Sequence, residues 1–209
     1  MARAVGQPGY RDEGGGSSSG SSSVRRFAFK GPDIGVGQVK ERRVAGMFIG
    51  EHTFKVDGKG RVSIPADFRR ELEEGDPLAA QSGRPRMVIV YGHDKQKQLI
   101  VHTYDGYRRL AADIAALPRG SEKRKIMERM ILNRARPTEV DADGRLVLPQ
   151  PLRDKIELEG TAYFAGLGET FEIWKPEAHA AVDAAVTEKW LEEQGDDFDP
   201  LSLLDDMGV

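Results

Sequence analysis

A fourteen-residue pattern occurs twice in this chain, at residues 56–69 and again at residues 140–153. The two copies align without a gap at a constant offset of 84 residues, and six of the fourteen positions are identical. Repetition at a fixed offset is typical of an internal duplication, so we expect two copies of one structural unit. The identical positions are Val56/Val140, Asp57/Asp141, Gly60/Gly144, Arg61/Arg145, Pro65/Pro149 and Arg69/Arg153.

Each copy predicts a tight turn between two strands, followed by a short helix. Asp57 can bond the backbone two residues further on, and Gly60 accepts a positive φ because it has no Cβ to clash. Val62 and Ile64 then alternate with a polar residue, as in a short strand with one buried face. Pro65 ends that strand and suits the first turn of a helix, where its missing N–H costs nothing. In the second copy Leu146 and Leu148 alternate with Val147, and the turn, the glycine and the proline recur.

The arginine that follows each turn leaves two interpretations open. Turn geometry alone explains the aspartate and the glycine of each copy. Arg61 and Arg145, in contrast, have long cationic side chains that can either anchor the loop to its own aspartate or project outward to contact an anion.

The residues after each motif follow the same order in both copies, which predicts two tandem βαββα units and an α+β, mainly β, fold. Each unit offers about 50–60 ordered residues, a size at which cores are marginal, and its short strands have edges that need covering. We therefore expect one interlocked barrel with peripheral helices. The expected strands lie at 87–91, 99–102, 162–165 and 171–174, and the expected closing helices at 107–117 and 178–186.

The two units, expected at residues 47–118 and 137–190, are joined by a basic linker helix at 119–136. Ser121 is placed to cap this helix, and Ile126 and Met130 belong to an apolar stripe along it. The opposite side is rich in lysine and arginine, which is compatible with a solvated face or with nucleic-acid contact.

The flanking segments differ from the repeats in composition and charge. Residues 1–46 contain a Gly/Ser run at 14–23 that cannot bury apolar surface, so we expect a disordered extension. We expect either that translation begins at Met47 or that these residues are dispensable. The basic residues of this extension are compatible with a nucleic-acid arm or a solvated tail. Net charge is +4 over 1–46, 0 over 47–186 and -7 over 187–209. Residues 191–209 are therefore an expected acidic tail.

Several functional classes find no support in the sequence. The chain has no cysteine, which removes thiol nucleophiles and cysteine-ligated metals. Its four histidines are scattered, and no HExxH or P-loop pattern occurs. We therefore expect no catalytic residues, no metal, no cofactor and no small-molecule substrate. No apolar run reaches the ~18 residues of a membrane span, so we expect a soluble, cytoplasmic chain without a membrane partner.

The doubled DxxGRxxxPxxxR pattern, with Met47-Phe48-Ile49-Gly50 ahead of it and Phe171-Glu172-Ile173-Trp174 near its end, resembles the MraZ family. This family comprises transcriptional regulators of the division and cell wall cluster, built from tandem SpoVT-AbrB domains. The resemblance implies a swapped-hairpin, double-split β-barrel of two interlocking halves and a ring-like homo-oligomer. It also implies a nucleoid-associated regulator, expected to be a repressor, that binds short direct repeats in the promoter of its own operon.

The resemblance also implies which residues contact DNA. The second loop has Asp143 where the first has Lys59, so we expect the first loop to make the main contacts with DNA. Because the core is neutral, strong binding requires several copies, and avidity in a ring can raise affinity by about 10²–10⁴. The expected DNA-binding residues are Asp57, Lys59, Gly60, Arg61 and Arg69 in the first copy, and Asp141, Gly144, Arg145 and Arg153 in the second.

A second hypothesis comes from a different class. On the same scaffold the chain can serve as a structural or interaction protein that binds a protein partner, as antitoxins of this fold do. The two loop arginines would then be internal struts. An enzyme on a related barrel is disfavoured because no catalytic constellation is present.

Overall fold

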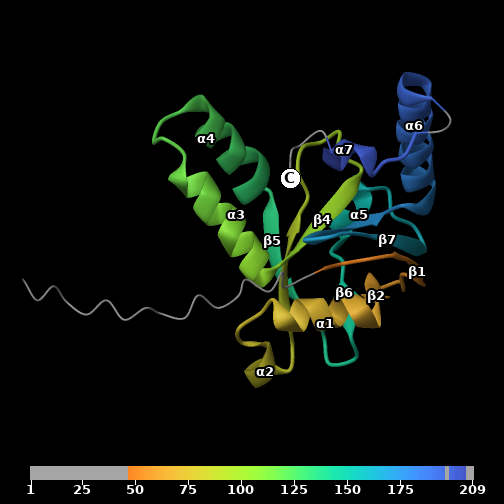
Figure 1. Cartoon of the computed structure of the whole chain (residues 1–209). Helices are drawn as coiled ribbons and strands as arrows, with labels where there is room; N and C mark the ends of the chain where they lie inside the picture. The colour runs from red at the N-terminus through yellow and green to blue at the C-terminus, as the bar shows by residue number, and fades with distance from the viewer. Residues whose placement is uncertain (1–46, 196–197, 206–209) are drawn as a thin grey trace, which may run out of the picture. The chain divides into compact units, whose positions relative to one another are not determined.

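The duplication produces a sheet in which strands of both repeats are mixed. The computed structural model describes residues 47–195 and 198–205, so the extension expected at 1–46 lies outside the described residues. A six-stranded antiparallel sheet has the order β1-β7-β8-β4-β3-β5, and a two-stranded ribbon pairs β2 with β6 (Figure 1). The strands are β1 (Glu51–Lys55), β2 (Arg61–Ser63), β3 (Arg86–Val90), β4 (Gln98–Thr103), β5 (Ala135–Glu139), β6 (Arg145–Val147), β7 (Thr161–Leu167) and β8 (Thr170–Trp174).

Short helices separate and follow these strands. Those predicted after the two prolines and after β4 and β8 are confirmed. The helices are α1 (Ala66–Glu74), α2 (Ala79–Ser82), α3 (Tyr104–Ala116), α4 (Glu122–Met127), the π-helical turn η1 (Glu128–Leu132), α5 (Gln150–Lys155), α6 (Pro176–Gln194) and α7 (Ser202–Asp205).

The strands pair across the repeats. β1 of the first repeat pairs with β7 of the second, and β5 of the second repeat pairs with β3 of the first. β4 and β8 pair at the centre of the sheet. The α+β, mainly β class is thus confirmed, and its strands form one large antiparallel sheet beside the ribbon. Within the described residues β1 and β5 remain the edges of this sheet, so closure into a barrel stays a prediction.

Aromatic side chains from both repeats form the centre of the core. The ring of Phe48 lies 5.3 Å from that of Phe68 on α1 and 4.9 Å from that of Phe171 on β8, measured between centroids. Phe164 on β7 completes the group. The ribbon closes the core from its own side, because Val62 and Leu146 are fully buried there.

The basic linker helix is shorter than its pattern indicates. Ser121 caps α4 as predicted, its Oγ accepting a hydrogen bond from the Arg124 N–H at 3.2 Å. The helix changes to the π-helical turn η1 after Met127. Ile126 and Met130 are 50% and 41% exposed, so this apolar stripe does not enter the core.

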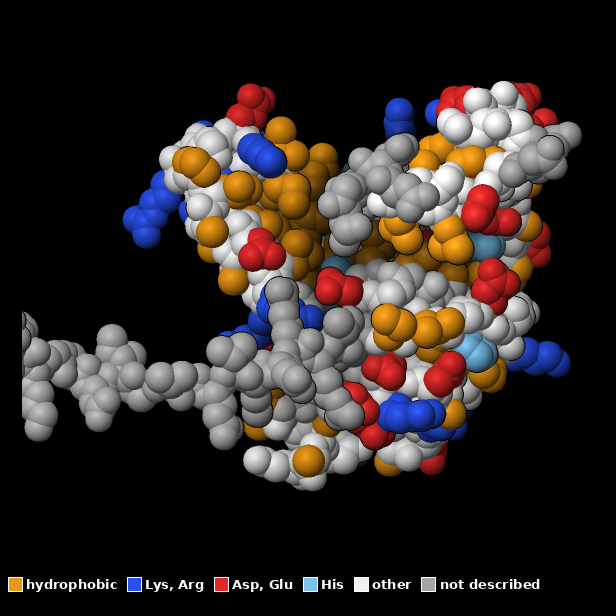
Figure 2. All heavy atoms as spheres, viewed as in Figure 1, with side chains coloured by type: hydrophobic (Ala, Val, Ile, Leu, Met, Phe, Trp, Pro, Cys, Tyr) orange, Lys and Arg blue, Asp and Glu red, His pale blue; other side chains and the backbone are white. Residues whose placement is uncertain are grey.

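Two helical arms carry exposed apolar side chains. α3 and α4 form one arm and α6 the other (Figure 1). α6 is joined to the sheet at its base, where His179 packs on Tyr163 with ring centroids 4.3 Å apart, and further along Val182 and Val186 are exposed. Figure 2 shows hydrophobic side chains gathered on the α3–α4 arm and beside the sheet. No helix of the described part of the chain has the length and apolar character needed to cross a membrane.

Candidate nucleic-acid interface

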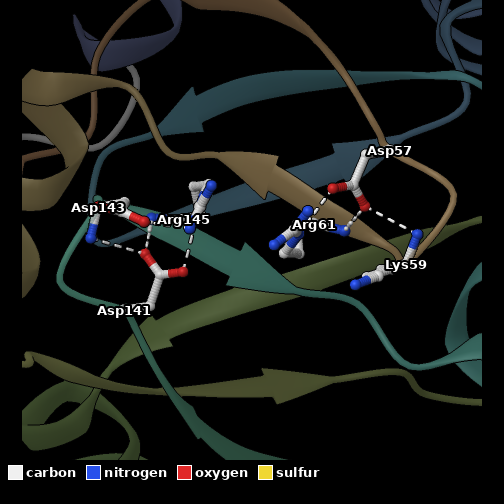
Figure 3. Close-up of polar contacts among 6 residues, drawn as sticks. All are labelled: Asp57, Lys59, Arg61, Asp141, Asp143 and Arg145. Carbon is white, nitrogen blue, oxygen red and sulfur yellow. Dashed lines mark hydrogen bonds and ion pairs between the residues drawn. The ribbon is translucent and has the colours of Figure 1, made fainter.

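The first turn places Arg61 by a network centred on Asp57. The Oδ1 atom of Asp57 accepts hydrogen bonds from the backbone N–H groups of Lys59 at 2.8 Å and Arg61 at 3.0 Å. Its Oδ2 atom accepts from Nε of Arg61 at 2.6 Å (Figure 3). The backbone closes the loop, since the Asp57 N–H donates to the Arg61 carbonyl at 3.0 Å. One carboxylate therefore fixes both the turn and the stem of the arginine.

The second turn repeats this network and adds one ion pair. Asp141 accepts from the N–H groups of Asp143 at 2.9 Å and Arg145 at 2.8 Å, and from Nε of Arg145 at 3.2 Å. In addition, Nη2 of Arg145 pairs with the carboxylate of Asp143. Arg145 is therefore held by two carboxylates, whereas Arg61 is held by one.

Glycine is required where each turn closes. Gly60 and Gly144 have φ values of 79° and 75°, in the left-handed region. Each glycine also joins the two repeats. The Leu148 N–H donates to the Gly60 carbonyl at 2.8 Å, and the Ile64 N–H donates to the Gly144 carbonyl at 3.0 Å. The two loops are thus tied together by the ribbon.

The ribbon brings both arginines to one outer face. Arg61 lies opposite Val147, and Arg145 lies opposite Ser63. Directly opposed residues of an antiparallel pair point to the same side, and the inner side is occupied by the buried Val62. Arg61 and Arg145 are therefore diagonal neighbours, about 7–8 Å apart by the usual strand geometry. The sequence predicted both residues but not that they share one surface.

The two loops differ in the charge they present. Lys59 is exposed, and its ammonium forms no ion pair with any described residue (Figure 3). The terminal nitrogens of Arg61 likewise have no hydrogen-bond partner within the described ranges. The equivalent groups of the second loop are engaged with each other, since Asp143 occupies the place of Lys59 and pairs with Arg145.

Hydrogen bonding shifts the titration of these groups. The backbone N–H of Arg61 and then its side chain lower the pKa of Asp57 to about 2. The same contacts from Arg145 lower the pKa of Asp141, and the bond to Asp141 raises the pKa of Arg145. Both aspartates are therefore ionised at neutral pH, and both loops keep their networks.

The last arginine of each motif lies against the loop of the other repeat. Arg69 on α1 lies against Gly144, and Arg153 on α5 lies against Gly60. Nε of Arg153 also donates to the Leu148 carbonyl at 3.1 Å. These contacts support the loops from behind. Contact of Arg69 and Arg153 with DNA stays a prediction.

A buried ion pair outside the motifs was missed by the sequence analysis. Arg86 at the start of β3 donates through Nη2 and Nε to Asp76, at 2.5 and 2.9 Å, and its guanidinium lies 3.8 Å from the ring centroid of Tyr104. Hydrogen bonds from Arg86 lower the pKa of Asp76 to about 2. Within the described residues no group of three or more histidine, cysteine or acidic residues could hold a metal ion.

Comparison with known proteins gives a consistent answer. The family model described as "MraZ protein, putative antitoxin-like" matches residues 47–124 and 131–195. The chain is 51% identical over 161 residues to the transcriptional regulator MraZ of Ruegeria sp. (strain TM1040), covering 77% of this chain and 96% of that protein. It is 49% identical to its counterpart in Ruegeria pomeroyi, covering 79% and 99%, and 34% identical to that of Marinobacter nauticus, covering 75% and 98%. The doubled motif, the paired loops and these matches together show that the chain belongs to the MraZ family.

Proposed function

We propose that the chain is a sequence-specific DNA-binding transcriptional regulator that represses its own division and cell wall operon by binding short direct repeats in the promoter. The relatives reported above are named transcriptional regulators, and that name denotes no enzyme class. The observation that carries the proposal is the outer face of the β2–β6 ribbon, where Arg61 and Arg145 lie side by side on two braced loops.

The ribbon is suited to contact a DNA groove. A two-stranded ribbon fits the major groove, and an arginine can donate two hydrogen bonds to one guanine. The terminal nitrogens of Arg61, unbonded within the described part of the chain, are available for such a bond, and Lys59 beside it can reach a phosphate. Because the aspartates hold both loops in place, little side-chain freedom is lost on binding.

Binding through one ribbon is weak, so the proposal includes a ring-like homo-oligomer. The core has a net charge of 0 over residues 47–186, and phosphate contacts supply most of the non-specific affinity of DNA-binding proteins. The exposed apolar side chains of the two helical arms, such as Met130 and Val186, are surfaces that a neighbouring copy can cover. Several linked ribbons then engage a tandem array of sites together.

The swapped-hairpin barrel belongs to the same proposal. The strand exchange between repeats supports it, as does the ribbon that covers the core with Val62 and Leu146. We infer that the ribbon and the six-stranded sheet together enclose one apolar interior, which holds the DNA-facing loops rigid.

The test is a gel-shift titration of the full chain on the upstream region of its own operon at several salt concentrations. Arg61→Ala should weaken specific binding by about 10–100-fold per loop, because a bidentate arginine–guanine contact contributes about 1–3 kcal/mol. Arg145→Ala should weaken binding less, since Asp141 and Asp143 already neutralise it.

Arg108→Ala is the matched control, because Arg108 lies on α3 outside the loops and its side chain is largely exposed. It removes the same charge and should leave the shift unchanged. Oligomer size and thermal stability should stay near wild type in all three variants. If Arg61→Ala unfolds the protein or breaks the oligomer while the folded fraction still binds DNA, Arg61 is a strut and the proposal fails.

One observation favours the alternative, an interaction protein on the same scaffold. Both loop arginines bond to an aspartate of their own loop, as struts would. The two functions separate in the same titration, since an interaction protein gives no salt-dependent shift on the upstream region.

A further inference from the structure

Each repeat has a groove between the sheet and the helix that follows the motif. The first repeat's groove is filled by its own chain, and the second repeat's groove is open. In the first repeat the groove beside α1 is filled by Phe48, which is 1% exposed and packs on Phe68 and Phe171. The chain is held there by backbone hydrogen bonds between Phe48 and Gly168 at 2.7 and 3.0 Å. The Met47 N–H also donates to the carboxylate of Glu71 at 3.1 Å.

The equivalent groove beside α5 in the second repeat is open. It is a cavity of about 590 Å³, whose floor includes Leu152, Pro149 and Tyr91. Leu152 is the equivalent of Phe68 at the offset of 84 residues. The equivalent of Phe48 is Leu132, which belongs to the π-helical turn η1.

A single position explains why the chain enters one groove and not the other. A Cβ on Gly166 of β7 would overlap the backbone of Phe48. Tyr91 is the equivalent position in the first repeat's β3–β4 hairpin, because the Gly166 N–H donates to Gly50 and the Tyr91 N–H donates to Arg134, in both cases at 2.9 Å. The Tyr91 side chain therefore occupies the path that the backbone of Phe48 takes over Gly166.

The open groove also has a different charge. Lys155 replaces Glu71, and among the described residues its Nζ donates to the backbone carbonyls of His93 and Gln96, at 2.6 and 3.2 Å. Arg136 replaces His52 and has no hydrogen bond or ion pair through its side chain to any described residue. Arg134, in contrast, is paired with Asp94 at 2.8 Å. Within the described residues, neither Arg136 nor Lys155 forms an ion pair at this groove, whose lining also includes the paired Asp94 and Arg134.

We propose that this groove binds the C-terminal segment of a second copy of the chain, with Phe198 in the position that Phe48 has in the first repeat. The groove fits an aromatic side chain flanked by carboxylates, and residues 196–199 have the sequence Asp-Asp-Phe-Asp within a segment of net charge -7. The carboxylates would face Lys155 and Arg136.

The position of Phe198 favours a second copy over the same chain. Phe198 is half-buried and stacks on Trp190 of α6 with ring centroids 5.8 Å apart. Residues 181–195 are all exposed, so this part of α6 does not pack on the sheet of its own chain. Residues 199–204 are exposed as well, so the segment is available to a neighbour. This inference does not depend on DNA binding.

The test uses the absence of cysteine from the chain, which gives single-cysteine variants without background. Pro151→Cys at the rim of the groove and Leu201→Cys after Phe198 are made in separate full-length chains of different mass and mixed. They are then treated with a bismaleimide whose spacer is about 10 Å, the reach of three extended residues. We expect a cross-linked heterodimer.

The matched control is Asp67→Cys, at the position equivalent to Pro151 in the first repeat, where Phe48 fills the groove. Asp67→Cys should give at least about tenfold less heterodimer than Pro151→Cys. The same loss should follow from adding Phe198→Ala to the Leu201→Cys chain, or from adding Arg136→Glu to the Pro151→Cys chain. Tenfold corresponds to about 1.4 kcal/mol. Arg136 is exposed and unpaired in the described structure, so the thermal stability of the Arg136→Glu variant should equal that of the wild type.

Three outcomes overturn the proposal. Equal linking from Asp67→Cys shows that the segment does not choose the open groove. A double Pro151→Cys, Leu201→Cys chain that closes only on itself, with no heterodimer in the mixture, places the segment in its own groove. If duplex DNA protects the Pro151→Cys thiol from alkylation and no heterodimer forms, the groove is part of a nucleic-acid surface.

Discussion

The first repeat fills the groove beside its helix with its own chain, whereas the second repeat leaves the equivalent groove open. The first fills its groove with Phe48 and has the buried pair of Asp76 and Arg86. At the position equivalent to Phe48 the second has Leu132 in η1, and none of its described polar side chains is buried as Asp76 is. We infer that after duplication one copy fills this groove with its own chain while the other keeps it open for a ligand.

The loops show the opposite division. The first loop keeps Lys59 and the terminal nitrogens of Arg61 free of partners within the described residues, while Asp143 neutralises Arg145 in the second. Identical turn networks therefore support different charges. A shared motif determines the backbone of the two loops, and the residues between its identical positions determine what each loop can contact.

The largest expected effect tests the groove comparison. Phe48→Ala removes a fully buried aromatic side chain and should lower the free energy of unfolding by about 3–5 kcal/mol. Leu132→Ala, the equivalent change in the second repeat, should cost about 1 kcal/mol, because Leu132 is partly exposed. Urea unfolding of the two variants measures both. Equal costs would show that the second groove is filled by its own chain in solution.

The next effect concerns the ion pair of Asp76 and Arg86 in the first repeat. The Asp76 side chain is 0% exposed and that of Arg86 is 31% exposed, so Asp76→Asn should cost about 3 kcal/mol at neutral pH by leaving Arg86 without its counter-charge. Glu139→Gln, which breaks the exposed pair with Arg84, should cost about 0–1 kcal/mol.

The same pair predicts part of the acid sensitivity. The pKa of Asp76 in the folded chain is about 2, against an ordinary value of 3.8. As the pH falls, Asp76 of the unfolded chain therefore binds a proton before Asp76 of the folded chain does. The stabilisation by Asp76 is therefore present above pH ~4 and is lost toward pH ~2. Urea midpoints across this range should fall more steeply for the wild type than for Asp76→Asn. Parallel curves would show that the pair does not contribute.

The elements that local chemistry dictates could be predicted from the sequence. The Asp-Gly turns, the strands after them, the helices after Pro65 and Pro149, and the Ser121 cap depend on residues within a few positions of each other. Asp57 and Arg61 are close along the chain, which is why an anchoring role for the arginine could be stated, and the structure shows that bond. Contact of the arginine with an anion stays a prediction.

Features that depend on distant partners could not be predicted. Two copies of one pattern predict the same strands whether they pair within a repeat or across it. The sequence therefore could not predict that β1 pairs with β7 and β5 with β3. The burial of Phe48 depends on the missing side chain of Gly166, far along the chain. The sequence also gave no sign that the linker helix changes to a π-helical turn at Glu128, and we have no physical account of that change.

The smallest expected effect tests whether the two loops are supported alike. Both Gly60→Ala and Gly144→Ala place a Cβ in the left-handed region, which costs about 1–2 kcal/mol. At Gly60 the new Cβ would also overlap the Leu148 carbonyl, a backbone atom held by the ribbon. At Gly144 it meets the end of the Arg69 side chain, which can move aside. We therefore expect Gly60→Ala to cost about 2–3 kcal/mol and Gly144→Ala about 1 kcal/mol in urea unfolding. Adding Arg69→Ala to Gly144→Ala should then recover nothing, and a clear recovery would mean that Arg69 is as rigidly held as the Leu148 backbone and that the two loops are braced equally.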